Sequence, residues 1–150
     1  AYMPRFAGDA IAPSPLGRVL AIAERLDTLA GGFAAGLKPT GNKDPFALRR
    51  NALGLARTMI EGGLDLDLLP WIDRAFELVR TDVDRIAGGA NAGADGKPVL
   101  EDIFSGSHLQ DFVIDRLRGY YAEQGVPATQ FDAVAEVRPG SLVDFDKRLK

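Results

Sequence analysis

The chain has 150 residues, of which 46% are hydrophobic and 26% charged, and these values are typical of a globular protein rather than a disordered or fibrous one. This length fits one domain that buries roughly two-thirds of its unfolded surface, and the net charge of -3 argues against a dedicated nucleic-acid-binding module. The chain has no cysteine, so we expect no disulfide and no thiolate metal site. It also has no long apolar run and no apolar leader, so we expect no membrane span and no signal peptide.

The first predicted helix follows a lead-in with prolines and a glycine, residues 1–13. Ser14 can cap this helix and Pro15 suits its first turn, while Gly31 and Gly32 are expected to end it. Its apolar residues recur at helical spacing on one arc: Leu16, Val19, Leu20, Ile22, Ala23, Leu26, Leu29 and Ala30.

A loop is predicted over residues 36–43 from their glycine, proline and asparagine content. Asp44 and Pro45 follow as a cap and a first-turn proline, so a second helix is expected to run to about Glu61. The apolar arc of this helix consists of Phe46, Leu48, Ala52, Leu53, Leu55, Ala56, Met59 and Ile60.

Four more helices are predicted in the rest of the chain. They are expected after Asp65 or Asp67 as far as Gly88, and over residues 107–124, 127–137 and 141–149. No stretch alternates apolar and polar residues with the β-branched enrichment of a strand. The sequence therefore predicts an all-α fold, a multi-helix bundle.

Two charged residues, Asp27 and Arg49, fall on the apolar arcs of the first and second predicted helices. An unpaired charge in a core would cost several kcal/mol, so the two are expected to meet. We predict a buried or half-buried salt bridge between Asp27 and Arg49 that locks the two helices together. The alternative is two ordinary charges whose long side chains reach water separately.

Charge is divided unevenly along the chain. Residues 38–57 hold five cations against one acid, a balance of +4, whereas residues 65–102 hold nine acids against four cations, a balance of -5. Cations on a loop and the adjoining helix can contact phosphate groups, and the candidates are Lys38, Lys43, Arg50 and Arg57. The alternative, which charge alone favours, is a solvated face that pairs with the acidic segment.

No catalytic or metal-binding constellation is found in the sequence. The run from Gly36 to Lys43 lacks the contiguous Gly-Lys-Ser/Thr and the preceding strand of a phosphate-binding loop. His108 is the only histidine, and no cysteine accompanies it as a second metal ligand. We therefore predict no catalytic and no metal-binding residue, and we expect Trp71 and the phenylalanines in the core.

The most unusual stretch is Gly36–Arg50, Gly-Leu-Lys-Pro-Thr-Gly-Asn-Lys-Asp-Pro-Phe-Ala-Leu-Arg-Arg. Together with Tyr2–Asp9 and Glu24–Leu29, it resembles the beta subunit of the two-subunit bacterial glycyl-tRNA synthetase. Asp115–Tyr120 and Val143–Leu149 resemble later parts of the same subunit. The resemblance covers most of the chain and is weakest from residue 64 to residue 105.

This resemblance implies an internal fragment of a heterotetrameric enzyme, and the start at Ala1 rather than at a methionine fits a fragment. In that family the alpha subunit holds the glycine and ATP site and uses magnesium, while the beta subunit contributes tRNA recognition and supports activity. The expected partners are the alpha subunit and tRNA, the expected location is the cytoplasm, and no cofactor is expected in this chain.

The resemblance further implies that residues 1–63 end an HD-like helical region and that residues 64–150 continue the beta-subunit body, unless both form one compact unit. HD-like domains are related to metal phosphohydrolases, whose final ligand is an aspartate in an Ala-Asp-Arg/Lys-Leu context. Glu24 occupies that setting within Ala23–Leu26, and no His-Asp pair is present. Two alternatives to a tRNA-binding portion stay open: an HD-type metal phosphohydrolase fragment and a purely structural interdomain spacer.

Overall fold

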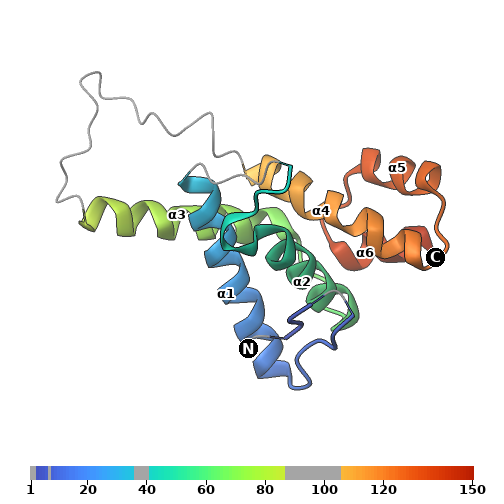
Figure 1. Ribbon diagram of the computed structural model, residues 1–150, viewed down its shortest axis with the longest axis horizontal. Coiled ribbons are helices and arrows are strands. Elements are labelled where there is room, and N and C mark those ends of the chain that lie inside the picture. Colours follow the sequence, from blue (N-terminus) through green and yellow to red (C-terminus); the bar gives the residue numbers. More distant parts are fainter. Residues whose placement is uncertain (1–2, 7, 36–40, 87–105) are drawn as a thin grey trace.

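The computed structural model describes residues 3–6, 8–35, 41–86 and 106–150, and this part of the chain is built from helices (Figure 1). In chain order they are α1 (Pro15–Ala34), the short 3-10 helix η1 (Pro45–Ala47), α2 (Leu48–Glu61), α3 (Leu68–Ile86), α4 (Gly106–Glu123), α5 (Ala128–Val137) and α6 (Leu142–Leu149). The described residues form no strand, only an isolated antiparallel bridge between Asp67 and Ser141. The all-α prediction is confirmed.

Serine side chains cap α1 and α6 as the sequence predicts. Ser14 Oγ accepts a hydrogen bond of 3.0 Å from the Gly17 amide, and Pro15 occupies the first turn of α1. Ser141 Oγ accepts from the Asp144 amide at 3.3 Å. These contacts satisfy amides that have no partner inside the helix.

Helix α1 continues through Gly31 and Gly32 to Ala34, beyond its predicted end. Gly32 is buried against α2, and a Cβ atom built on it would lie 2.8 Å from a methyl carbon of Leu48. The missing side chain therefore allows the two helices to approach closely, and it does not end the helix.

Asp44 caps α2 from a position four residues before the helix. Its Oδ1 atom accepts from the Leu48 amide at 2.8 Å, and its Oδ2 atom accepts from the Arg49 amide at 3.2 Å. Between them, Phe46 and Ala47 have φ angles of 61° and 51°, which interrupt the helical path. The Asp44 carboxylate thus binds the first two amides of α2, as expected of a capping residue, but the N-cap position of α2 is Ala47, and the helix begins at Leu48 rather than near Pro45.

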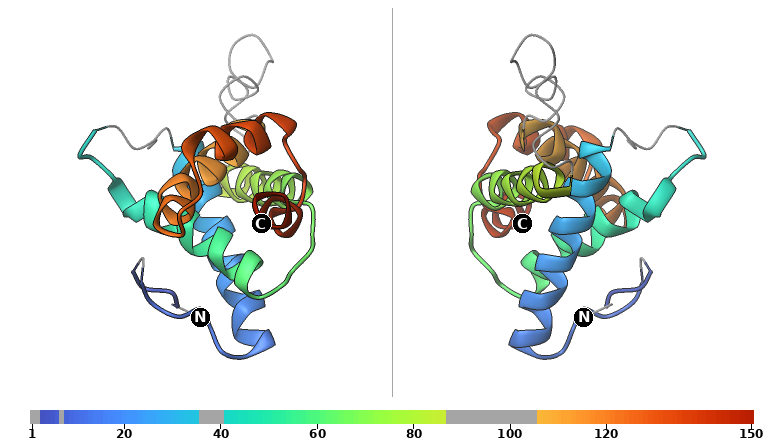
Figure 2. Two further views of the ribbon diagram at one scale, coloured as in Figure 1. Left: turned by 90° about the vertical axis from the view of Figure 1, so that its right-hand side faces the viewer. Right: turned by 90° about the vertical axis from the view of Figure 1, so that its left-hand side faces the viewer.

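Helices α1 to α4 pack as neighbours: α1 contacts α2 and α3, and α4 contacts the same two helices most extensively (Figures 1 and 2). The hydrophobic core runs from Leu26 in α1 to Leu149 in α6 and includes residues of all six described α-helices. The division at residue 63 stays a prediction, as does the HD-like likeness. Within the described ranges, no helix is both long enough and apolar enough to cross a membrane.

Aromatic side chains join the last three helices. Tyr121 of α4, Phe131 of α5 and Phe145 of α6 are buried, with ring centroids 5.4 to 6.2 Å apart. The Tyr121 hydroxyl donates a hydrogen bond of 2.7 Å to Asp146 Oδ1, so its polar end is satisfied inside the cluster. The cluster holds α5 and α6 against the end of α4.

Several apolar residues expected in the core lie on the surface instead. Leu16 and Leu20 of α1 are 70% and 51% exposed, and Trp71 at the start of α3 is 51% exposed. The apolar arc that the sequence predicts for the first helix is therefore too wide, because it includes residues on the face turned away from α2. The prediction that Trp71 is a core residue is wrong, and so is that for Phe6 and Phe46, which are 59% and 71% exposed.

Candidate nucleic-acid interface

Residues 3–6 and 8–14, called here the first segment, lie against α1 and α2 (Figure 1). Arg5 forms an ion pair of 3.0 Å with Asp9 inside this segment. The hydrogen bonds from Arg5 to the Asp9 carboxylate lower the pKa of Asp9. Arg18 Nε donates to the Ala12 carbonyl at 2.9 Å and ties the segment to the start of α1.

Arg25 of α1 is buried between α2 and this segment, with 6% of its surface exposed. One terminal nitrogen donates to Asn51 Oδ1 at 3.2 Å, and the other donates to the Pro4 carbonyl. The guanidinium lies over Gly54, where a Cβ atom would be 2.4 Å from Arg25 Cζ. Glycine at this position of α2 therefore makes room for the buried charge.

No carboxylate of the described residues forms an ion pair with Arg25, and its Nε atom is buried without a hydrogen-bond partner. Burial lowers the pKa of Arg25, the charge of Glu24 raises it, and the charge of Arg50 lowers it. Arg25 thus carries a buried positive charge that neutral acceptors only partly satisfy, which is an uncommon arrangement in a protein interior.

Arg57 is buried as well, with 7% of its surface exposed, so the prediction that it forms part of a phosphate-contacting surface is wrong. Its Nε donates to Glu61 Oε2 at 2.7 Å, and a terminal nitrogen donates to the Asp9 carbonyl at 2.7 Å. Its guanidinium lies 6.0 Å from the ring centre of Tyr120. Arg57 therefore links the first segment, α2 and α4.

The predicted salt bridge between Asp27 and Arg49 does not form. Asp27 is exposed, Arg49 is half-buried, and no ion pair joins them among the described residues. At about 100° per residue, Asp27 lies about 160° around α1 from the buried Leu29, on the opposite face. The charged residue of α1 that meets α2 is Arg25.

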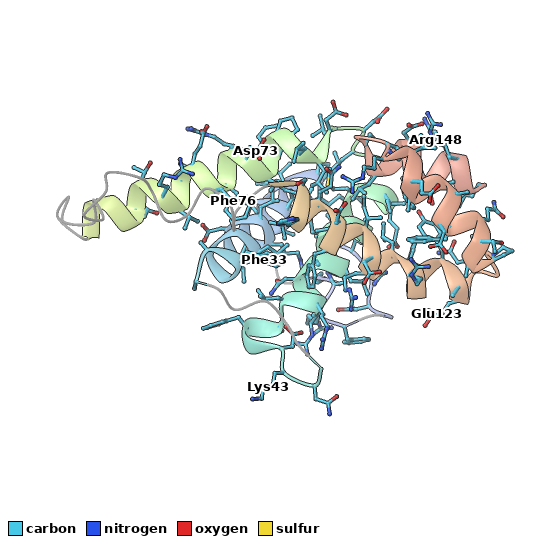
Figure 3. The ribbon with its side chains drawn as sticks, turned by 90° about the horizontal axis from the view of Figure 1, so that it is seen from above. Phe33, Lys43, Asp73, Phe76, Glu123 and Arg148 are labelled. Atoms are coloured by element: carbon cyan, nitrogen blue, oxygen red, sulfur yellow. The ribbon has the colours of Figure 1, made fainter. Side chains whose placement is uncertain are left out.

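The remaining candidates differ in their placement. Lys38 lies outside the described residues. Lys43 is exposed at the edge of the molecule, where Figure 3 shows it apart from the packed helices. Arg50 is exposed on α2, and within the described ranges neither Lys43 nor Arg50 takes part in an ion pair.

Arg50 also lines a pocket of about 330 Å³ between the first segment, α1 and α2. Its charged lining residues are Arg5, Arg25, Arg50 and Glu24, three cations against one acid, or a balance of +2. Asn51 and Thr28 add polar surface, but Asn51 Nδ2 donates to the Phe46 and Ala47 carbonyls, and the Thr28 hydroxyl donates to the Glu24 carbonyl. The pocket is thus positively charged in a chain whose net charge is -3.

Sequence reasoning missed Arg25 as a site residue. It lies within Glu24–Leu29, and its residue type alone does not distinguish it from the other charged residues of α1. The available signal was its position four residues before Leu29, which places it on the buried side of α1. What the sequence could not show is that a segment 21 residues earlier, at Pro4, supplies an acceptor for its guanidinium.

The described part of the chain contains no group of three or more histidine, cysteine, aspartate or glutamate residues able to hold a metal ion. His108 is exposed at the start of α4. The fold and the site thus define the class of protein: an all-α chain with a basic pocket and exposed cations next to it, which is an arrangement suited to anions.

Comparison with known proteins gives the family. Residues 1–136 match the family model described as glycyl-tRNA synthetase beta subunit. The glycine–tRNA ligase beta subunit of Xanthomonas campestris pv. campestris (strain 8004) is 62% identical over 149 residues, covering 99% of this chain and 20% of that protein. The chain belongs to the glycyl-tRNA synthetase beta subunit family.

Two further relatives carry the same name. The beta subunit of Xylella fastidiosa (strain 9a5c) is 54% identical over 162 residues, with 99% of this chain and 22% of that protein covered. That of Pseudomonas putida (strain W619) is 40% identical over 149 residues, with coverages of 99% and 19%. The chain therefore spans about a fifth of the length of the relatives it matches.

Proposed function

We propose that this chain is a non-catalytic part of a glycine–tRNA ligase that helps to hold tRNA through contacts with its phosphate backbone. The observation that carries the proposal is that Lys43 and Arg50 are exposed and form no ion pair among the described residues. Lys38 is proposed to join them. In this proposal the alpha subunit attaches glycine to tRNA using ATP and magnesium, in the cytoplasm.

Lysine and arginine on a loop and a helix suit this task because a nucleic-acid backbone presents regularly spaced negative charges. Such contacts fix position and orientation without reading bases, so they need no pocket for a nucleotide base. Each cation that meets a phosphate releases condensed counterions, which makes binding weaker as salt concentration rises.

The structural-spacer alternative requires these cations to pair with the acidic segment. Among the acids of that segment whose side chains the structure describes, Glu77 pairs with Arg74, and Asp65, Asp67 and Asp73 form no ion pair with Lys43 or Arg50. This observation favours the tRNA-binding proposal over the spacer.

The HD-type phosphohydrolase alternative requires a metal held by histidine and aspartate ligands. Glu24, at the position of the final ligand in the resemblance, lines a pocket with Arg5, Arg25 and Arg50. Three guanidinium groups next to this position would repel a bound cation. Metal analysis of the purified chain tests this alternative, since a stoichiometric metal would favour the hydrolase.

The proposal is tested in the intact two-subunit synthetase by reversing Lys38 and Lys43 to glutamate. We expect the Michaelis constant for tRNA to rise by at least about fivefold, because two contacts become repulsive. Glycine-dependent adenylate formation should stay unchanged. Arg80→Glu combined with Lys147→Glu reverses two exposed cations of α3 and α6, the same total change of charge, and is the matched control. Unaltered tRNA kinetics in the reversal of Lys38 and Lys43 would overturn the proposal.

A further inference from the structure

The residues that line the pocket beside Arg25 leave a net positive charge without a matching acid. Arg25 is 6% exposed and has no ion-paired carboxylate among the described residues. Arg50, on the neighbouring helix, is exposed and also unpaired, and both line the same pocket. The two positive charges repel each other, because the charge of Arg50 lowers the pKa of Arg25.

Binding of an anion would remove this opposition. The Nε atom of Arg25 is buried without an acceptor, so this guanidinium keeps an unsatisfied donor in addition to its net charge. The donors of Arg50 form no ion pair among the described residues. The Nε atom of Arg5, in contrast, already pairs with Asp9 Oδ2 at 3.0 Å. Planar guanidinium groups recognise oxyanions by paired hydrogen bonds.

The pocket is large enough for such a ligand. Its volume of about 330 Å³ is roughly ten times the share of liquid volume that one water molecule takes, about 30 Å³. A tetrahedral oxyanion with part of its hydration shell fits this space. Among the described residues that line the pocket, Glu24 is the one acid, so we expect the ligand to lie nearer the three arginines.

We propose that this pocket binds one phosphate-class oxyanion, held between Arg25 and Arg50 with Arg5 at the rim. Gly54 is part of the site, because its missing side chain leaves the room that the Arg25 guanidinium occupies beside α2. The inference goes beyond backbone contacts at Lys43, since the pocket can bind inorganic phosphate whether or not Lys43 touches tRNA. The oxyanion can come from a tRNA or from a free phosphate, and the chemistry of recognition is the same.

The test is calorimetric titration of the full chain with sodium phosphate, with sodium chloride at matched ionic strength as the reference. We expect saturable binding of phosphate to one site. Arg50→Gln should weaken it by at least about fivefold, because an exposed donor and a charge are lost. Arg80→Gln removes an exposed arginine of α3 that does not line this pocket, and it should bind as the unchanged chain does.

Gly54→Ala gives a second, independent arm, because its methyl group displaces the Arg25 guanidinium without removing any charge. It should also weaken phosphate binding by at least about fivefold. A repeat titration with saturating tRNA separates the sources: loss of the phosphate signal assigns the oxyanion to tRNA, and persistence assigns it to free phosphate. Absence of saturable phosphate binding, or equal binding by Arg50→Gln and the unchanged chain, would overturn the inference.

Discussion

The guanidinium of Arg25 lies against the backbone of Gly54, so closely that a Cβ atom on Gly54 would be 2.4 Å from Arg25 Cζ. This relationship joins α1 to α2 by a charged group that is 6% exposed. It also places that charge beside the exposed Arg50 and the first segment of the chain. The stability of the helix pair and the charge of the pocket therefore depend on the same contact.

Gly54→Ala should destabilise the chain by about 1–3 kcal/mol, because Arg25 loses its hydrogen bonds to Asn51 and Pro4. Helix propensity alone would make alanine stabilising by about 1 kcal/mol relative to glycine. A net loss of unfolding free energy would therefore show that the methyl group displaces Arg25. The measurement is urea unfolding. Gly119→Ala in α4, where a Cβ meets nothing within 4 Å, is the control and should be stabilising or neutral. Equal effects at the two positions would contradict this account of Arg25.

Arg57→Ala should cost about 1–3 kcal/mol of unfolding free energy, because it leaves the Asp9 carbonyl and Glu61 without their buried donor. Arg74→Ala breaks an ion pair of the same kind with Glu77, but both side chains are more than 60% exposed. That control should change stability by less than about 0.5 kcal/mol. A cost at Arg57 no greater than at Arg74 would show that Arg57 does not link the segments.

Tyr121→Phe should make the free energy of unfolding fall less steeply as pH rises above about 10. Burial raises the pKa of Tyr121 well above its ordinary value of 10.0, and the hydrogen bond to Asp146 adds to this. Above pH of about 10 the unfolded chain releases the phenolic proton while the folded chain keeps it, so stability falls as pH rises. Unfolding free energies of both proteins between pH 8 and about 11.5 test this, and parallel curves would contradict it.

Trp71 is the only tryptophan, and its exposed fraction of 51% predicts a solvent-accessible fluorophore. Its emission should lie close to that of the unfolded chain, and acrylamide should quench it efficiently. Trp71→Gln should change stability by less than about 1 kcal/mol, because about half of the side chain already contacts water. Emission strongly shifted to the blue and protected from acrylamide would place Trp71 in a core.

Much of the helical order was predictable because it depends on neighbouring residues. Ser14 and Ser141 cap their helices as short-range chemistry requires, and Asp44 caps α2 even across an interruption. Gly32 could not be interpreted in the same way. Its role depends on Leu48, which lies 16 residues later and on another helix.

The site was less predictable because contacts between residues far apart in the sequence decide which charged side chains are buried. Arg50 and Arg57 are seven residues apart on one face of α2, yet only Arg57 is covered, by the Asp9 carbonyl. Asp27 and Arg25 differ by two positions on α1, and this small shift decides which charge faces α2. No periodicity in the sequence places the segment before α1, and this segment determines which cations stay exposed.

The most direct test of the central claim is the salt dependence of tRNA binding by the chain, measured by fluorescence anisotropy from about 50 to 200 mM salt. We expect the affinity to fall steeply with salt. The double variant Lys43→Glu and Arg50→Glu should bind at least about tenfold more weakly at low salt, with a shallower slope, while Lys147→Glu should match the unchanged chain. An affinity and a slope equal to those of the unchanged chain would contradict the assignment of Lys43 and Arg50 to the tRNA backbone.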